Sequence, residues 1–168
     1  PHQPNEPEAL YAKSKNPSRA VGVARPYRSI RHELASALAW LLRGTPDVPD
    51  RDLVAYLVAA HHGKVRLSIR SLPDEHGDPA RPDALFARGI WEGDTLPLIP
   101  GITTEPIPLD LTFMRMGENQ HGPSWLARAV VLRDHWGPFS LALLETILRA
   151  ADARASKLNP ATLAGIPC

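Results

Sequence analysis

Four polar side chains lie in or beside otherwise apolar helical segments, and their types are those that bind metal ions: His32, His61, His62 and Asp152. Neutral imidazole is the commonest protein ligand for first-row transition metals. Two consecutive histidines followed at once by Gly63 can line one cleft where a helix ends, and the helix dipole favours a cation there. A carboxylate at the edge of an apolar stripe needs hydrogen bonds, a cation or a metal as compensation. Together the four residues predict a mixed nitrogen and oxygen metal site between helices.

Each of these residues also has an ordinary interpretation. His32 lies opposite the apolar stripe of its own segment and is open to a structural or surface role. The pair His61 and His62 is equally suited to capping free carbonyls at a helix end, and Asp152 has arginine neighbours with which it can pair. One metal site has the advantage that it accounts for all four residues at once.

Other catalytic arrangements are excluded by residue type and spacing. No two histidines stand four apart with a glutamate after the first, no glycine-rich phosphate loop occurs, and no serine has nucleophile-elbow glycines around it. The single cysteine, Cys168, excludes a disulfide scaffold and a cysteine-based zinc site and fits a reducing compartment. The remaining histidines in or beside the loop-rich segment are interpreted as solvated: His76, His121 and His135.

The elements that position the four residues are predicted to be helices. Apolar residues form one stripe over residues 29–43, and a second helix runs from Leu53 to His62 with Asp50 as its N-cap. Helical patterns return over residues 125–135 and 138–157. Residues 1–26 are expected to form an irregular arm that holds a short helix near residues 9–14. The chain is therefore predicted to have four or five helices around one core and to belong to the mainly α class.

The segment of residues 73–123 has a different composition. It holds eight of the 18 prolines, six of the 11 glycines, and nine acids against three bases. We interpret it as a Pro/Gly-rich insertion outside the core. Alternating apolar residues over 65–71, and β-branched and aromatic residues over 107–113, predict a small β-hairpin or edge strands.

The charges exclude some partners and favour others. The 168 residues carry 19 Lys and Arg against 18 Asp and Glu, a net charge of +1, which excludes a uniformly basic nucleic-acid coat. Residues 61–73, however, hold three bases and no acid. If the predicted metal site acts on a phosphodiester, we expect Lys64 to touch the scissile phosphate as a catalytic residue and Arg66 and Arg70 to bind the substrate. Ordinary solvated bases are the alternative. The longest apolar run has eight residues, far below the roughly 20 needed to cross a bilayer, and no signal peptide opens the chain, so we expect a cytoplasmic protein with no membrane partner.

Three short segments resemble the later motifs of HD-superfamily metal-dependent phosphohydrolases: RHEL at 31–34, AAHHGK at 59–64 and ADARAS at 151–156. More narrowly, they resemble the HD nuclease domain of the CRISPR-associated nuclease-helicase of type I interference systems. The resemblance implies a helical HD-type bundle that binds one or two divalent transition metals and cuts single-stranded DNA. It also implies a CRISPR effector complex and helicase segments as partners. The His-rich set of ligands itself favours Mn, Fe, Co, Ni or Zn over Mg, which prefers oxygen. By the same resemblance the metal ligands are His32, His61, His62 and Asp152.

The chain departs from the family pattern in one respect. The family is named for a His-Asp dipeptide, and none occurs in these 168 residues. We therefore expect residues 1–168 to be a partial HD-type domain that begins downstream of that motif, and the alternative is a degenerate, inactive domain. Two other functions remain open: an HD phosphohydrolase of nucleotides, and a metal-free helical interaction domain whose Pro-rich insertion binds a protein partner.

Overall fold

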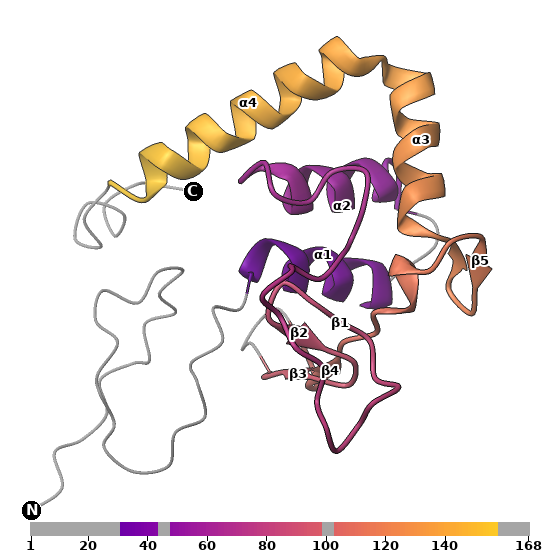
Figure 1. Cartoon of the computed structure of the whole chain (residues 1–168). Helices are drawn as coiled ribbons and strands as arrows, with labels where there is room; N and C mark the ends of the chain where they lie inside the picture. Colours follow the sequence, from indigo (N-terminus) through magenta and orange to yellow (C-terminus); the bar gives the residue numbers. More distant parts are fainter. Residues whose placement is uncertain (1–30, 44–47, 99–102, 158–168) are drawn as a thin grey trace, which may run out of the picture.

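The computed structural model describes residues 31–43, 48–98 and 103–157. Four α-helices and three small strand pairs make up this part of the chain (Figure 1). The helices are α1 (His32–Arg43), α2 (Arg51–Ala60), α3 (Trp125–Trp136) and α4 (Pro138–Ala155). The predicted mainly α class is confirmed, whereas the predicted arm over residues 1–26 and its short helix lie outside the described residues.

Helices α1 and α2 lie side by side and run antiparallel (Figure 1). The indole of Trp40 in α1 donates a 3.0 Å hydrogen bond to the carbonyl of Arg51, and the guanidinium of Arg51 donates to the carbonyl of Leu41. These bonds join the end of α1 to the start of α2. The first turn of α1 therefore lies beside the last turn of α2, at the other end of the helix pair.

The helix ends follow the predicted boundaries closely, with one exception in how they are capped. Asp50 precedes α2 but makes no side-chain cap hydrogen bond, because its backbone is left-handed with φ 56°. Asp50 is thus the N-cap residue by position, as predicted, but it does not cap the helix with its side chain. Ser124 does cap α3 by accepting a 3.3 Å hydrogen bond from the amide of Ala127. Gly137, with φ 78°, separates α3 from α4, and Pro138 opens α4 as predicted.

The interpretation of residues 73–123 as an insertion outside the core is wrong. Ile90, Leu111 and Phe113 from this segment are at most 1% exposed and pack with the leucines of α1. The segment forms a 3-10 helix, η1 (Thr112–Met114), and three antiparallel pairs: β1 (Phe86–Ala87) with β2 (Ile90–Trp91), β3 (Thr95–Leu96) with β4 (Ile107–Pro108), and β5 (Glu118–Asn119) with β6 (Gly122–Pro123). The β1–β2 and β3–β4 pairs thus form a hairpin layer on the side of α1 that faces away from α2, and the β5–β6 pair lies beside the start of α3 (Figure 1).

No strand forms over residues 65–71, contrary to prediction. Val65 and Ile69 are buried in the core, but the backbone between them forms hydrogen bonds outside any strand pair. The carbonyl of Arg66 accepts a 2.6 Å hydrogen bond from the indole of Trp125 in α3. This contact binds the loop to α3 and occupies a carbonyl that a strand ladder would require.

Helix α4 runs from the end of α3 along α2 and in the same direction as α2 (Figure 1). Its inward stripe consists of the buried Leu141 and Glu145 and the half-buried Leu144, Leu148 and Asp152. Its outward face leaves large apolar side chains exposed, with Phe139 at 90%. No helix in the described ranges has the length and apolar character to cross a membrane.

Candidate metal centre

Three histidines meet where α1 begins and α2 ends. His32 is the first residue of α1, while His61 and His62 follow the last residue of α2. One nitrogen of each ring lies within 4.8 Å of the others, and Nε2 of His62 is 3.2 Å from Nε2 of His32. The antiparallel packing of α1 and α2 therefore brings His32 together with a histidine pair that follows it by about 30 residues in sequence.

The turn after α2 aims both consecutive histidines at the same place. The amide of Gly63 donates a 2.6 Å hydrogen bond to the carbonyl of Ala60, and Gly63 has φ 70°, a left-handed conformation that favours glycine. The rings of His61 and His62 are 4.0 Å apart between centroids and tilted by 41°. Adjacent residues inside a continuous helix would point about 100° apart, so the turn is what lets both rings serve one site.

A backbone contact fixes the orientation of one ring. Nδ1 of His61 lies 2.6 Å from the carbonyl of Val58, so Nδ1 carries the proton and donates it. The lone pair of that ring is then on Nε2. Metal-binding histidines are commonly oriented by such a hydrogen bond from the second ring nitrogen.

The donor set fits a divalent transition metal. Two nitrogen ligands of a tetrahedral ion lie about 3.3 Å apart when each bond is about 2.0–2.1 Å long. The 3.2 Å between the Nε2 atoms of His32 and His62 agrees with that separation. Three imidazoles favour Mn, Fe, Co, Ni or Zn over Mg, which prefers oxygen.

The surroundings of His62 favour the neutral form of its ring. Burial lowers the pKa of His62, and the neighbouring His61 lowers it further, against a smaller opposing effect of Glu33. A neutral ring keeps the lone pair that a metal needs. The pKa shift thus acts in the direction that metal binding requires.

Asp152 lies near this cluster but is not a member of the group within 4.8 Å. It is half-buried on the inward stripe of α4, and its charge acts on the pKa of His62. Of the four predicted ligands, the structure therefore brings the three histidines together, whereas Asp152 lies outside their group.

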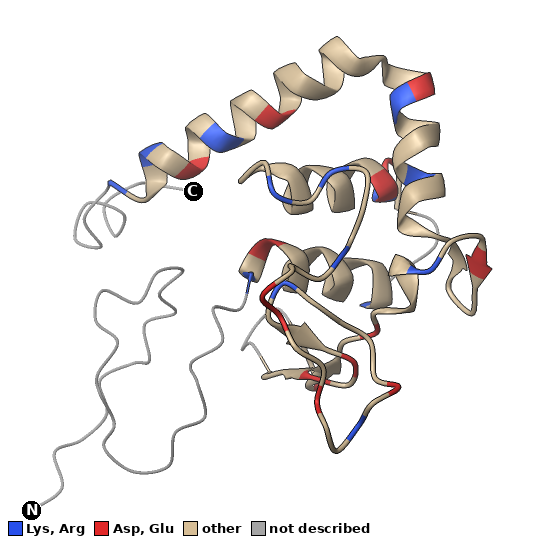
Figure 2. Ribbon diagram, viewed as in Figure 1, with Lys and Arg blue, Asp and Glu red and all other residues tan. Residues whose placement is uncertain are grey.

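The three predicted substrate contacts have different surroundings. Lys64 is exposed directly after the histidine turn, and Arg70 is exposed further along the same loop. Arg66 donates from Nε to a carboxylate oxygen of Glu145 at 2.9 Å, so its guanidinium also ties the loop to α4. Figure 2 shows Lys and Arg on this loop and, interspersed with Asp and Glu, on α4.

Sequence reasoning missed two residues that hold the histidine segments. The carbonyl of Arg88, in the β1–β2 turn, accepts a 3.2 Å hydrogen bond from the amide of Arg31, just before His32. The guanidinium of Arg88 donates at 3.2 Å to the carbonyl of Lys64, just after the histidine pair. Glu75 in turn accepts from the amides of Arg88 and Gly89, at 3.1 and 2.5 Å. Their contacts with the histidine segments and with one another join residues 13 to 57 positions apart in the chain, which no local sequence pattern indicates.

The interpretation of His121 as a solvated residue is wrong. Its Nε2 lies 2.7 Å from a carboxylate oxygen of Asp110, and its ring stacks on Phe113 at 5.2 Å. Burial alone would raise the pKa of Asp110, but hydrogen bonds from Thr112, His121 and Gln120 outweigh it and lower the pKa to about 2. The pair belongs to the packing between η1 and the β5–β6 hairpin.

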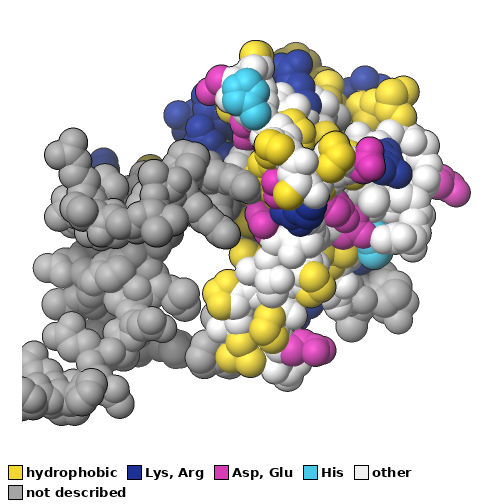
Figure 3. Space-filling view, turned by 60° about the horizontal axis from the view of Figure 1, so that its bottom comes forward, with side chains coloured by type: hydrophobic (Ala, Val, Ile, Leu, Met, Phe, Trp, Pro, Cys, Tyr) yellow, Lys and Arg dark blue, Asp and Glu magenta, His cyan; other side chains and the backbone are white. Residues whose placement is uncertain are grey.

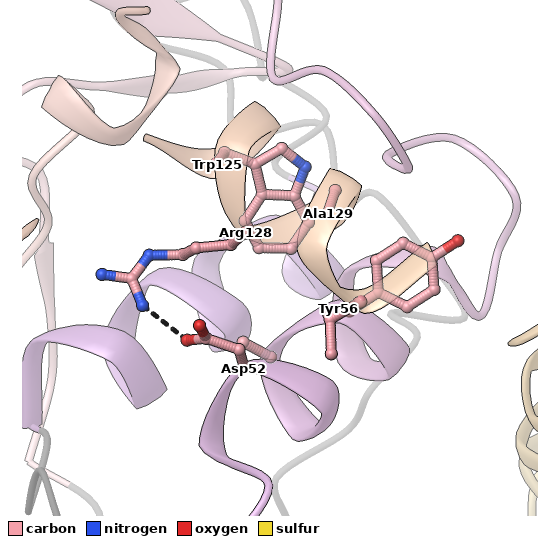
Figure 4. A pocket seen from close by; sticks show the side chains of 7 residues that line it. Asp52, Tyr56, Trp125, Arg128 and Ala129 are labelled. Carbon is pink, nitrogen blue, oxygen red and sulfur yellow. Dashed lines mark hydrogen bonds and ion pairs between the residues drawn. The ribbon is translucent and has the colours of Figure 1, made fainter. Parts of the chain in front are cut away.

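The hollows between helices lie away from the histidines. Figure 4 shows the contact between α2 and α3, where Arg128 pairs with Asp52 at 2.5 Å beside Tyr56 and Trp125. These side chains fill the contact and leave no volume for a ligand. An open hollow of about 360 Å³ lies next to this contact, at the first turn of α2. On the face of the molecule seen in Figure 3, hydrophobic side chains are interspersed with acidic and basic ones.

No family model matches the chain, and no significant match is found among curated proteins or solved structures. The function is therefore inferred from the residues of the candidate metal centre.

Proposed function

We propose that this chain is the HD-type part of a metal-dependent nuclease that hydrolyses phosphodiester bonds of single-stranded DNA, as in the CRISPR interference nuclease-helicases that its motifs resemble. The observation that carries the proposal is the convergence of His32, His61 and His62 within 4.8 Å at one end of two antiparallel helices. A three-histidine group with a carboxylate nearby is a donor set for a catalytic transition metal, since such sites use few protein ligands and keep a position open.

The residues of the chain have distinct roles in this proposal. The three histidines hold the metal, and Asp152 approaches from α4 as the carboxylate ligand. When bound, a divalent transition metal supplies Lewis-acid chemistry that polarises a phosphodiester and makes water more acidic. The chain itself contributes the orientation of the imidazoles, through the Val58 carbonyl behind His61 and the turn at Gly63.

Basic side chains around the cluster support a polyanionic substrate. Lys64 and Arg70 are exposed on the loop that leaves the site, and Arg66 keeps 55% of its side chain exposed while it pairs with Glu145. Such groups would neutralise phosphates and make substrate affinity fall with rising salt. Lys64, nearest to the histidine pair in sequence, is the one we place at the scissile phosphate.

DNA cleavage tests this proposal directly. The protein supplied with Mn²⁺ or Ni²⁺ is expected to degrade an end-labelled single-stranded oligonucleotide, and His61→Ala and His62→Ala are expected to abolish the cleavage. His135→Ala is the matched control, because His135 is an exposed residue at the end of α3. Cleavage that survives both substitutions, or that persists in EDTA, would contradict the proposal. Turnover of nucleotides without any cutting of DNA would favour an HD phosphohydrolase instead.

A helical interaction domain is the second candidate, and the surface of α3 and α4 favours it. Val131, Phe139, Leu143 and Ile147 are between 56% and 90% exposed on these two helices. Exposed apolar side chains gathered on neighbouring elements are typical of protein contact sites. A protein that binds no metal under non-chelating conditions would favour this candidate over both enzymes.

A further inference from the structure

The side chain of Glu33 is the unexplained group next to the candidate metal centre. It is 0% exposed, and neither of its carboxylate oxygens has a hydrogen-bond partner in the described part of the chain. A carboxylate in an apolar interior is strongly disfavoured unless a positive charge or donors compensate it. The apolar neighbours of Glu33 on the buried face of α1, Ala37 and Leu41, supply neither.

This carboxylate makes a longer polar contact with a member of the cluster. Nδ1 of His32 lies 3.7 Å from Oε2 of Glu33, while Nε2 of the same ring lies 3.2 Å from Nε2 of His62. The two edges of the His32 ring therefore face different groups, and the edge toward the other histidines carries Nε2. If Nε2 is the ligand atom, the proton of the neutral ring resides on Nδ1 and points to Glu33.

We propose that Glu33 is a positioning residue for the metal centre: it accepts the Nδ1 proton of His32 and holds Nε2 of that ring toward His61 and His62. This inference rests on the proposed metal centre. The 3.7 Å separation is longer than a hydrogen bond, and a small rotation of His32, whose side chain is 47% exposed, closes it. The buried negative charge also offsets the charge of a divalent cation among three neutral rings.

The same geometry predicts opposite effects of Glu33 on metal binding and on the metal-free fold. Without metal, the carboxylate is buried with no partner among the described residues, so its removal leaves the fold unharmed or stabilises it. With metal, its removal releases His32 and weakens binding. If Glu33 merely supported the helix, its removal would instead lower the stability of the fold and leave the metal affinity unchanged.

Two substitutions and two measurements test the proposal. Glu33→Leu removes the acceptor, and Glu33→Gln keeps a neutral acceptor of the same shape. Titration with Co²⁺, followed by visible absorption, is expected to show a Kd raised about 10–100-fold in Glu33→Leu, with an altered spectrum, and a smaller rise in Glu33→Gln. In EDTA, Glu33→Gln is expected to melt at or above the wild-type temperature.

Each outcome is informative about one claim. Co²⁺ affinities of both variants within twofold of the wild type, or a metal-free Glu33→Gln protein that melts below the wild type, would overturn the role of Glu33 and leave the metal centre standing. A wild-type protein that binds no Co²⁺ would overturn the proposed metal centre, and the role of Glu33 with it.

Discussion

The hydroxyl of Tyr56 in α2 donates a 2.7 Å hydrogen bond to the carboxylate of Glu145 in α4, and this buried bond sets how the two parallel helices are aligned. From Tyr56 the chain advances six residues to His62, and from Glu145 it advances seven to Asp152. At about 1.5 Å per helical residue these are nearly equal distances along the shared direction. The bond therefore explains why Asp152 lies near the cluster although its helix follows α2 by some 80 residues.

Loss of this bond should be measurable in stability. Burial, followed by the hydrogen bond to Glu145, raises the pKa of Tyr56, so its hydroxyl remains a donor throughout the accessible pH range. Tyr56→Phe is expected to lower the free energy of unfolding by about 1.5–3 kcal/mol, the usual range for a hydrogen bond to a charged group. Urea denaturation measures this change in the free energy of unfolding, and Thr146→Ala on the exposed side of α4 is the control. A change below about 0.5 kcal/mol in Tyr56→Phe would argue against the role of this bond.

Asp152 is expected to act as the carboxylate ligand although it stands outside the histidine group. Its position on the inward stripe of α4 lets a small shift of the last turns bring it to a bound ion. Asp152→Asn should weaken Mn²⁺ binding by about tenfold or more, as measured by calorimetry. The matched control is Asp134→Asn, an exposed acid on α3 that pairs with its neighbour Arg133. Equal affinity of Asp152→Asn and the control would remove Asp152 from the ligand set.

Arg88 combines a backbone and a side-chain role that two substitutions can separate. Its φ of 55° is unfavourable for residues other than glycine, and its guanidinium holds the carbonyl of Lys64. Arg88→Gly and Arg88→Ala both lose the side chain, so both are expected to bind metal more weakly than the wild type. Arg88→Gly should be more stable than Arg88→Ala by about 1 kcal/mol, because only alanine is strained at this φ. Equal stabilities by urea denaturation would show that the turn relaxes.

The Asp110 carboxylate is expected to give the fold an acid-sensitive contribution. Its folded pKa of about 2 lies below the ordinary 3.8, so the stabilisation is complete above pH 4 and is lost as the pH falls toward 2. The size is about 2 kcal/mol for this shift. Thermal unfolding of the wild type and Asp110→Asn should therefore differ most above pH 4 and converge near pH 2. A difference that stays constant over this range would contradict the assignment.

The helices and the histidine pair could be predicted from sequence because their signals are local. The apolar stripes, Gly63 after His62, and Gly137 before Pro138 each act within one or two turns. The same stripe contained a signal for Glu33, which falls four residues before the apolar Ala37 and eight before Leu41 on one helix face. A carboxylate in that position is unexpected on a buried face of a helix.

The sequence predicts a small hairpin or edge strands over residues 107–113, where β4 lies, but it does not predict the other strands, which are two residues long and carry no periodicity. Side chains fix the turns of these hairpins instead. Glu75 binds the amides of the β1–β2 turn, and Asp94 accepts a 2.9 Å hydrogen bond from the amide of Trp91. The pairing of His121 with Asp110 likewise depends on a chain reversal between them. Such contacts follow from the folded backbone, and composition alone indicates only loops.

Calorimetric titration of Ni²⁺ into the wild type and into His62→Ala tests the metal centre most directly, with His135→Ala as the control. The wild type and the control are expected to bind the ion alike. His62→Ala is expected to bind it about 100-fold more weakly or worse, since loss of an outer partner alone typically costs about 10–100-fold. A wild-type protein that binds no Ni²⁺, or His62→Ala binding as tightly as the wild type, would contradict a metal site at the junction of α1 and α2.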